Sequence, residues 1–185
     1  MTDKECDPAA GVLSRRNFLK LSGTALVSLT LPAYLRKSGL PAVLTAQQVE
    51  YPRQVIGRLS ELNFDQPISF IYPWDHPSAA NLLIKLNEPA GGGVGPDKDV
   101  VAFNTFCTHQ GGPLSEQFHG DVGVAGPCPL HWTTFDLTRH GMVVSGHATQ
   151  GLPQIILETD GDDIIATGVM GLIFSYQNNL VDPSA

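Results

Sequence analysis

Two short segments of the chain each carry a cysteine followed closely by a histidine, and both residue types bind metals. The segments are Cys107-Thr108-His109 and Cys128-Pro129-Leu130-His131, with eighteen residues between them. Two thiolates and two imidazoles can bind a structural zinc ion or an iron–sulfur centre. The ligand types by themselves leave both kinds of site open.

The order of these residues favours a two-iron cluster. Zinc fingers usually pair two neighbouring cysteines with two neighbouring histidines around one tetrahedral ion. Here each segment offers one sulfur and one nitrogen, which suits a cluster in which one iron takes both cysteines and the other takes both histidines. A disulfide between Cys107 and Cys128 is a further alternative, but it would leave His109 and His131 without a role.

These segments resemble the Rieske family, whose pattern is Cys-x-His, a spacer, and Cys-x-x-His. The likeness extends to neighbouring residues, namely Gly111, Gly112, Pro129, Phe135-Asp136-Leu137 and Gly141. The resemblance implies one Rieske [2Fe-2S] cluster, with iron bound by Cys107, His109, Cys128 and His131. It also implies that both histidines lie near the surface. Imidazole is neutral where thiolate is anionic, so this cluster should accept an electron more easily than one held by four cysteines.

Four positions beside the ligands are predicted to tune the reduction potential. Gly112 and Leu130 stand where respiratory Rieske subunits carry two further cysteines, which form a disulfide between the loops. Thr133 and Phe135 stand where those subunits carry a serine and a tyrosine that donate hydrogen bonds toward the cluster and a cysteine sulfur. The chain keeps the first hydroxyl and lacks the second. Donors to sulfur favour the reduced state, so we expect a lower potential than in a respiratory subunit.

The remaining four histidines match no ligand position of the family pattern. They are His76, His119, His140 and His147. We expect them to be surface or hydrogen-bonded side chains.

The residues from Arg53 onward are predicted to form short strands around the two segments. Apolar runs rich in Val, Ile, Phe and Tyr alternate with Gly, Pro, Asn and Asp, and no long helical periodicity occurs. The predicted strands are 54–59, 68–72, 82–86, 100–106, 133–137, 142–145, 154–159, 164–167 and 172–176. Asp160-Gly161 predicts a hairpin. The fold expected is all-β, a Rieske-type antiparallel sandwich or barrel with a small cluster-binding subdomain at about 104–153.

The N-terminal residues resemble a twin-arginine export signal. Ser14-Arg15-Arg16-Asn17-Phe18-Leu19-Lys20 precedes an uncharged stretch at residues 21–35. That stretch is shorter than the roughly twenty residues that span a membrane as a helix, so cleavage is favoured over a retained membrane anchor. We therefore expect an export signal at 1–46, a Rieske domain at 47–185, and a periplasmic protein.

Charge is distributed unevenly between these two parts. Residues 1–46 hold six of the eleven Lys and Arg but three of the eighteen Asp and Glu. The rest carries five basic against fifteen acidic side chains, a net charge of −10. Such a balance argues against a nucleic acid or an anionic membrane surface as partner, and it favours solubility or a basic redox partner.

Within the Rieske family the chain most resembles the small subunit of arsenite oxidase. The export signal, the changes at Gly112 and Leu130, and the segment 146–155, which resembles that family's third cluster-covering loop, carry this likeness. It implies a large molybdenum-containing catalytic subunit as partner and a cytochrome c or similar acceptor, with no substrate chemistry on this chain. Two alternatives are the Rieske subunit of a quinol-oxidising cytochrome bc complex and the ferredoxin of a dioxygenase. The missing disulfide counts against the first, and the export signal against the second.

Overall fold

The computed structural model divides the chain into two units, Met1–Ala46 and Gln47–Ala185, and describes residues 50–179 and 182. The expected export signal lies outside the described residues. Those residues contain strands and three short 3-10 turns but no α-helix, so the predicted all-β fold is confirmed. No helix in this part of the chain is long and apolar enough to cross a membrane.

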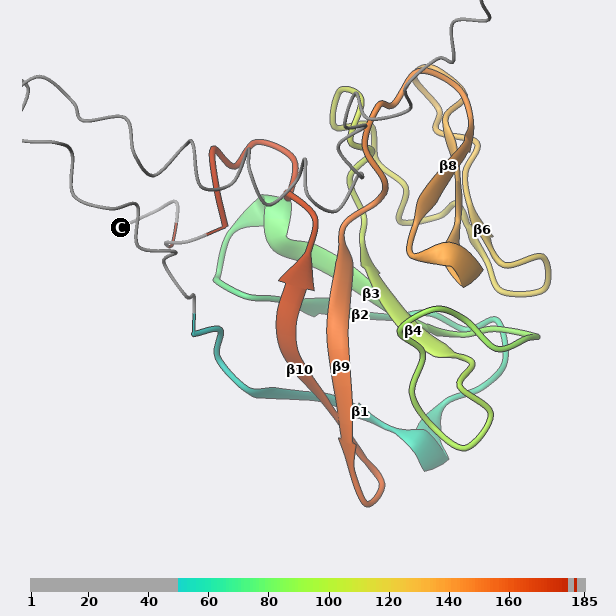
Figure 1. Ribbon diagram of the computed structural model, residues 1–185, viewed down its shortest axis with the longest axis vertical. Coiled ribbons are helices and arrows are strands. Elements are labelled where there is room, and N and C mark those ends of the chain that lie inside the picture. The colour runs from blue at the N-terminus through green and yellow to red at the C-terminus, as the bar shows by residue number, and fades with distance from the viewer. Residues whose placement is uncertain (1–49, 180–181, 183–185) are drawn as a thin grey trace, which may run out of the picture. The chain divides into compact units, whose positions relative to one another are not determined.

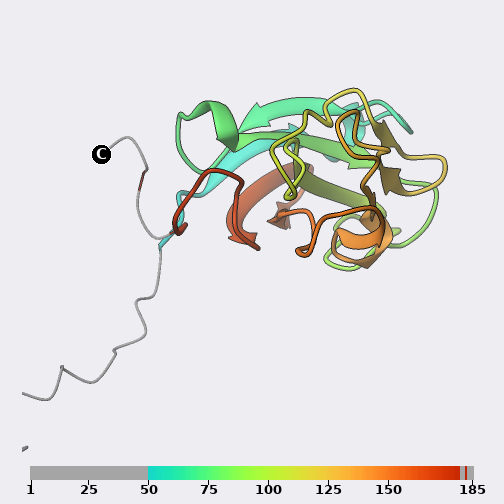
Figure 2. The same ribbon diagram turned by 90° about the horizontal axis from the view of Figure 1, so that it is seen from above.

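Six antiparallel strands form the larger sheet, in the order β1-β10-β9-β4-β3-β2 (Figure 1). Their bounds are β1 Gln54–Arg58, β2 Ile68–Ile71, β3 Ala80–Lys85, β4 Val100–Asn104, β9 Gln154–Asp160 and β10 Asp163–Met170. The sheet is strongly curved, as Figure 2 shows. Its two edge strands, β1 and β2, approach each other. The Gln54 side-chain amide of β1 donates a hydrogen bond to the Ile71 carbonyl of β2 at 3.2 Å. The sheet is therefore a nearly closed barrel.

The central strands β3 and β4 are buried on both faces, and alternate residues enter two different cores. Val100 and Ala102 pack inside the barrel, whereas Val101 and Phe103 pack on its other side, against the second sheet. Successive side chains of a strand point to opposite faces, which explains the division. It also explains why these two strands are continuous apolar runs instead of alternating ones.

Four short strands form the second sheet, in the order β5-β6-β7-β8. Their bounds are β5 Phe118–His119, β6 Val124–Ala125, β7 Thr134–Asp136 and β8 Met142–Ser145. The buried side chains of Leu114, Phe135 and Leu137 pack this sheet onto Phe103 of β4. Residues 118–145 thus form a small subdomain attached to one face of the barrel, within the range 104–153 expected for cluster binding.

One expected strand is absent, and two short strands were not expected. Residues 172–176 are not a strand, because β10 already pairs with β1 and β9, and Gly171 and Ser175 adopt positive φ angles of 96° and 72° that break an extended chain. The strands β5 and β6 were not expected, since two residues are too few to show a period. The hairpin is present, with Asp160 paired to Asp163 across a turn at Gly161.

Candidate functional site

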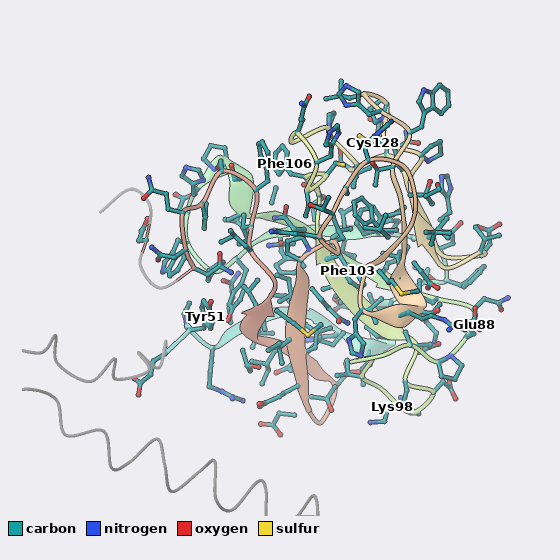
Figure 3. All side chains as sticks on the ribbon, turned by 45° about the horizontal axis from the view of Figure 1, so that its top comes forward. Tyr51, Glu88, Lys98, Phe103, Phe106 and Cys128 are labelled. Atoms are coloured by element: carbon teal, nitrogen blue, oxygen red, sulfur yellow. The ribbon has the colours of Figure 1, made fainter. Side chains whose placement is uncertain are left out.

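Three loops meet beside the second sheet. The first loop, residues 105–113, follows β4; the second, 126–133, precedes β7; the third, 146–153, follows β8. None of them contains Asp, Glu, Lys or Arg. Cys128 of the second loop lies at the end of the domain away from Lys98 (Figure 3). The strong negative charge of the domain is therefore carried elsewhere.

Each cysteine-bearing loop folds back on its own cysteine through backbone hydrogen bonds. In the first loop the Cys107 N–H donates to the Gly112 carbonyl at 2.9 Å, and the Gly111 N–H donates to the Cys107 carbonyl at 2.8 Å. In the second loop the Cys128 N–H donates to the Thr133 carbonyl at 2.8 Å. Both cysteines are held in tight turns whose shape depends on backbone bonds.

The two sulfurs lie in the apolar core between the sheets. Cys107 and Cys128 are each 1% exposed, and both are free thiols, so they form no disulfide. Burial raises the pKa of the Cys107 thiol, and the neighbouring Cys128 adds to this effect. Hydrogen bonds from the His109 backbone N–H and the Thr133 hydroxyl lower it. Donors directed at a buried sulfur are suited to a thiolate whose charge iron neutralises.

His109 and His131, one from each cysteine-bearing loop, bring their imidazoles together. The ring centroids lie 4.7 Å apart at an interplanar angle of 80°. The Nδ1 atom of His109 is buried and has no hydrogen-bond partner among the described residues. An unpaired buried nitrogen is costly unless a metal or donor satisfies it, so this atom is suited to bind iron.

The four side chains fit a two-iron cluster in number as well as in type. Within residues 50–179 and 182, no three His, Cys, Asp or Glu side chains form a group that could hold a single metal ion. In a Rieske cluster two cysteines bind one iron and two histidines bind the other.

Gly112 is the point where the first and second loops touch. A Cβ atom at this position would lie 2.5 Å from the Cys128 sulfur and 3.1 Å from Cγ of Leu130. No side chain fits there without moving the cysteine. The residues that replace the respiratory disulfide therefore make a direct packing contact between the loops.

His147 is a neighbour of the site that sequence reasoning did not include. Its ring centroid lies 5.6 Å from that of His109 and 6.4 Å from that of His131. Its side chain is exposed, as expected, and its backbone N–H donates to the Thr133 hydroxyl at 3.2 Å. Residues 146–155 resemble a cluster-covering loop, and this likeness could have predicted that His147 lies near the site.

Two of the other histidines are hydrogen-bonded, as expected. The His76 Nδ1 accepts a bond from the Ser78 N–H at 3.1 Å. The His140 Nδ1 lies 2.8 Å from the side-chain oxygen of Gln154. His119 lies in β5 and is half-buried.

Three of the four positions predicted to tune the reduction potential lie in the first and second loops, and the fourth, Phe135, lies in the adjoining strand β7. Thr133 is fully buried beside Cys107. Phe135 is fully buried in β7. Gly112 and Leu130 form the contact between the loops. Phe135 itself has no hydroxyl that could donate to a sulfur.

The residues that flank His131 are exposed and apolar. Leu130 is 50% exposed and Trp132 is 73% exposed. Trp132 also adopts a positive φ of 62°, a backbone conformation that is unfavourable for a bulky side chain. Such outliers cluster at functional sites, where the surrounding structure maintains them.

Comparison with known proteins identifies the family. The model of the Rieske [2Fe-2S] domain matches residues 76–156. Iodate reductase subunit IdrB of Pseudomonas sp. (strain SCT) is 49% identical over 183 residues, which cover 98% of this chain and 93% of that protein. The subunit of the same name from Denitromonas iodatirespirans is 53% identical over 178 residues, covering 94% and 92%.

A solved structure shows the same fold. The soluble domain of Rieske protein II from Sulfolobus acidocaldarius superposes with a TM-score of 0.60 at 23% identity, covering 72% of this chain and 86% of that one. The family model includes both Cys-His segments, and the two iodate reductase subunits match nearly the whole chain. The chain therefore belongs to the Rieske family of proteins that carry one [2Fe-2S] cluster.

Proposed function

We propose that this protein is the electron-transfer subunit of an exported oxidoreductase of the iodate reductase kind. The observation that carries the proposal is the match of about half of all residues, over nearly the full length, to two proteins named as iodate reductase subunits. In this proposal the chain transfers electrons and the substrate does not react on it. Its partner would be a large molybdenum-containing subunit on which the substrate reacts.

The cluster would be held by Cys107 and Cys128 at one iron and by His109 and His131 at the other. When bound, it supplies a one-electron donor and acceptor. The chain buries both sulfurs in its core, directs the Thr133 hydroxyl at Cys107, and keeps both imidazoles half-exposed at the surface. Electrons would enter and leave on the histidine side, where less protein separates the iron from a partner.

The expected direction of electron flow depends on the substrate. Residues 146–155 resemble a loop of arsenite oxidase small subunits, which favours arsenite oxidation. That reaction would send electrons from the molybdenum subunit through this chain to a cytochrome c-type acceptor. Reduction of iodate consumes electrons instead. In that case a cytochrome c-type donor would supply them to this chain, which would pass them to the catalytic subunit.

Export to the periplasm is part of the proposal. The Arg15-Arg16 motif and the uncharged stretch at 21–35 support a twin-arginine signal within residues 1–46, and cleavage would release the domain. A segment that is retained would anchor the protein to the membrane. Mass spectrometry of the native periplasmic protein would show whether its N-terminus lies near residue 47.

Purification of the native complex tests the function. We expect a large subunit to co-purify with molybdenum, and iodate to oxidise reduced cytochrome c in its presence. Arsenite-dependent reduction of cytochrome c would instead favour the arsenite oxidase alternative. Isolation of the chain alone, or in a quinol-dependent complex with cytochrome b, would contradict the proposal.

Phe135→Tyr is expected to raise the midpoint potential by roughly 40 mV. The new hydroxyl would donate to a cluster sulfur, a hydrogen bond contributes about 1 kcal/mol, and a one-electron couple moves by about 59 mV for a tenfold change in equilibrium. Protein-film voltammetry measures the shift. Phe70→Tyr is the control, because Phe70 packs on the other core, inside the barrel. An unchanged or lower potential in Phe135→Tyr would contradict the role given to this position.

A further inference from the structure

The C-terminal segment, residues 171–179, packs against the first cluster loop. The ring of Phe174 lies directly on the backbone of Gly111, so closely that a Cβ atom at Gly111 would collide with Cε1 of the ring. Gly111 also has a positive φ of 68°, which favours glycine. An aromatic ring therefore covers the loop backbone two residues beyond the ligand His109.

The C-terminal segment is held in a defined shape by its own contacts. The Asn179 side-chain amide donates to the Gly171 carbonyl at 2.6 Å, and its oxygen accepts from the Ile173 N–H at 3.3 Å. The Tyr51 hydroxyl donates to the Asn179 carbonyl at 3.2 Å. These bonds close the segment into a loop and join it to the residues before β1.

Two side chains on either side of Phe174 anchor the segment to the domain. Ile173 is fully buried, and Tyr176 is buried against Trp74 and the ring of His76. Phe174 therefore projects from a fixed backbone.

Backbone hydrogen bonds shape the first loop, and Gly112 packs it against Cys128 and Leu130 of the second loop. Both cysteines are free thiols, so no disulfide joins the first loop to the second within the described residues. The bond from the Thr108 hydroxyl to the Gln150 carbonyl, 2.8 Å long, ties the first loop to the third but is exposed to solvent. Exposed hydrogen bonds contribute little to rigidity, because water competes for both partners. The Phe174 ring covers the loop from a different element.

We propose that Phe174 is a positioning residue for the cluster. Its ring packs on Gly111, which fixes the position of the first loop and excludes water from the side of the cluster near His109. The inference rests on the proposed ligand set but not on the identity of the catalytic partner. Loss of the ring would let water approach the cluster and let His109 move. Water stabilises the reduced cluster more than the oxidised one, because reduction adds a negative charge.

The experiment compares three variants of the full chain purified with its cluster. Phe174→Ala removes the ring, and Phe174→Leu retains an apolar side chain over Gly111. Leu172→Ala is the matched control, because Leu172 belongs to the same segment and is partly exposed. The measurements are the rate of loss of visible absorbance in the presence of a chelator, the EPR spectrum of the reduced cluster, and the midpoint potential.

We expect Phe174→Ala to lose its cluster severalfold faster than the unmodified protein, with a broadened EPR spectrum and a higher midpoint potential. Phe174→Leu should restore most of each property, and Leu172→Ala should change none. If Phe174→Ala matches the unmodified protein in all three, the inference is wrong. Equal effects of Leu172→Ala and Phe174→Ala would also overturn it, since they would reflect general packing of the segment. These readouts need no partner, so they stand apart from the test of iodate reduction.

Discussion

His131→Ala is expected to abolish the visible and EPR signals of the cluster, whereas His147→Ala is expected to retain them. The two histidines carry the same side chain, and their ring centroids are 6.4 Å apart. His131 is half-buried in the second loop and follows the Cys-x-x-His pattern, whereas His147 is exposed on the third loop. An iron with one of its two protein nitrogens removed is open to water and is lost from the site.

The measurement is the iron and sulfide content of the purified protein together with its visible spectrum. His140→Ala serves as a further control, because the His140 ring is hydrogen-bonded to Gln154 of β9. A full cluster in His131→Ala, combined with its loss in His147→Ala, would show that the third loop supplies the ligand. That outcome would overturn the assignment of Cys107, His109, Cys128 and His131.

Gly112→Ala is expected to reduce cluster content sharply although it adds only one methyl group. The methyl carbon would lie 2.5 Å from the Cys128 sulfur, so the ligand or the loop must move. Overpacking of this kind typically costs about 1–3 kcal/mol in the free energy of unfolding. The displaced atom is a proposed iron ligand, so we expect cluster binding to be affected more strongly than stability.

Gly161→Ala is the matched control for this substitution. No heavy atom lies within 4 Å of a Cβ at Gly161, which forms the turn between β9 and β10. Its positive φ of 58° means that alanine costs about 1–2 kcal/mol through the backbone alone. Denaturant unfolding and iron analysis of both variants separate the two effects. A Gly112→Ala protein that keeps a full cluster would contradict the close approach of the loops.

The accuracy of the predicted strands did not follow the length of the apolar pattern, because the longest prediction, 100–106, ran two residues past β4. Residues 142–145 were predicted without error, and the prediction for 154–159 was one residue short of β9. The segment 172–176 has an equally apolar sequence, yet both edges of its neighbour β10 are already paired. Pairing partners come from distant parts of the chain, so a local pattern does not reveal which apolar segment will be left out of the sheet.

The sequence by itself determined the chemistry of this protein. Cysteine and histidine have specific affinities for metals, and their alternation in two short segments depends only on the order of residues. The tertiary structure decided which other residues surround that chemistry. His147 beside the two imidazoles, Gly112 against the Cys128 sulfur and Phe174 on Gly111 are contacts between segments far apart in the chain. Such contacts arise from the packing of loops on the two sheets, and no spacing in the sequence specifies them.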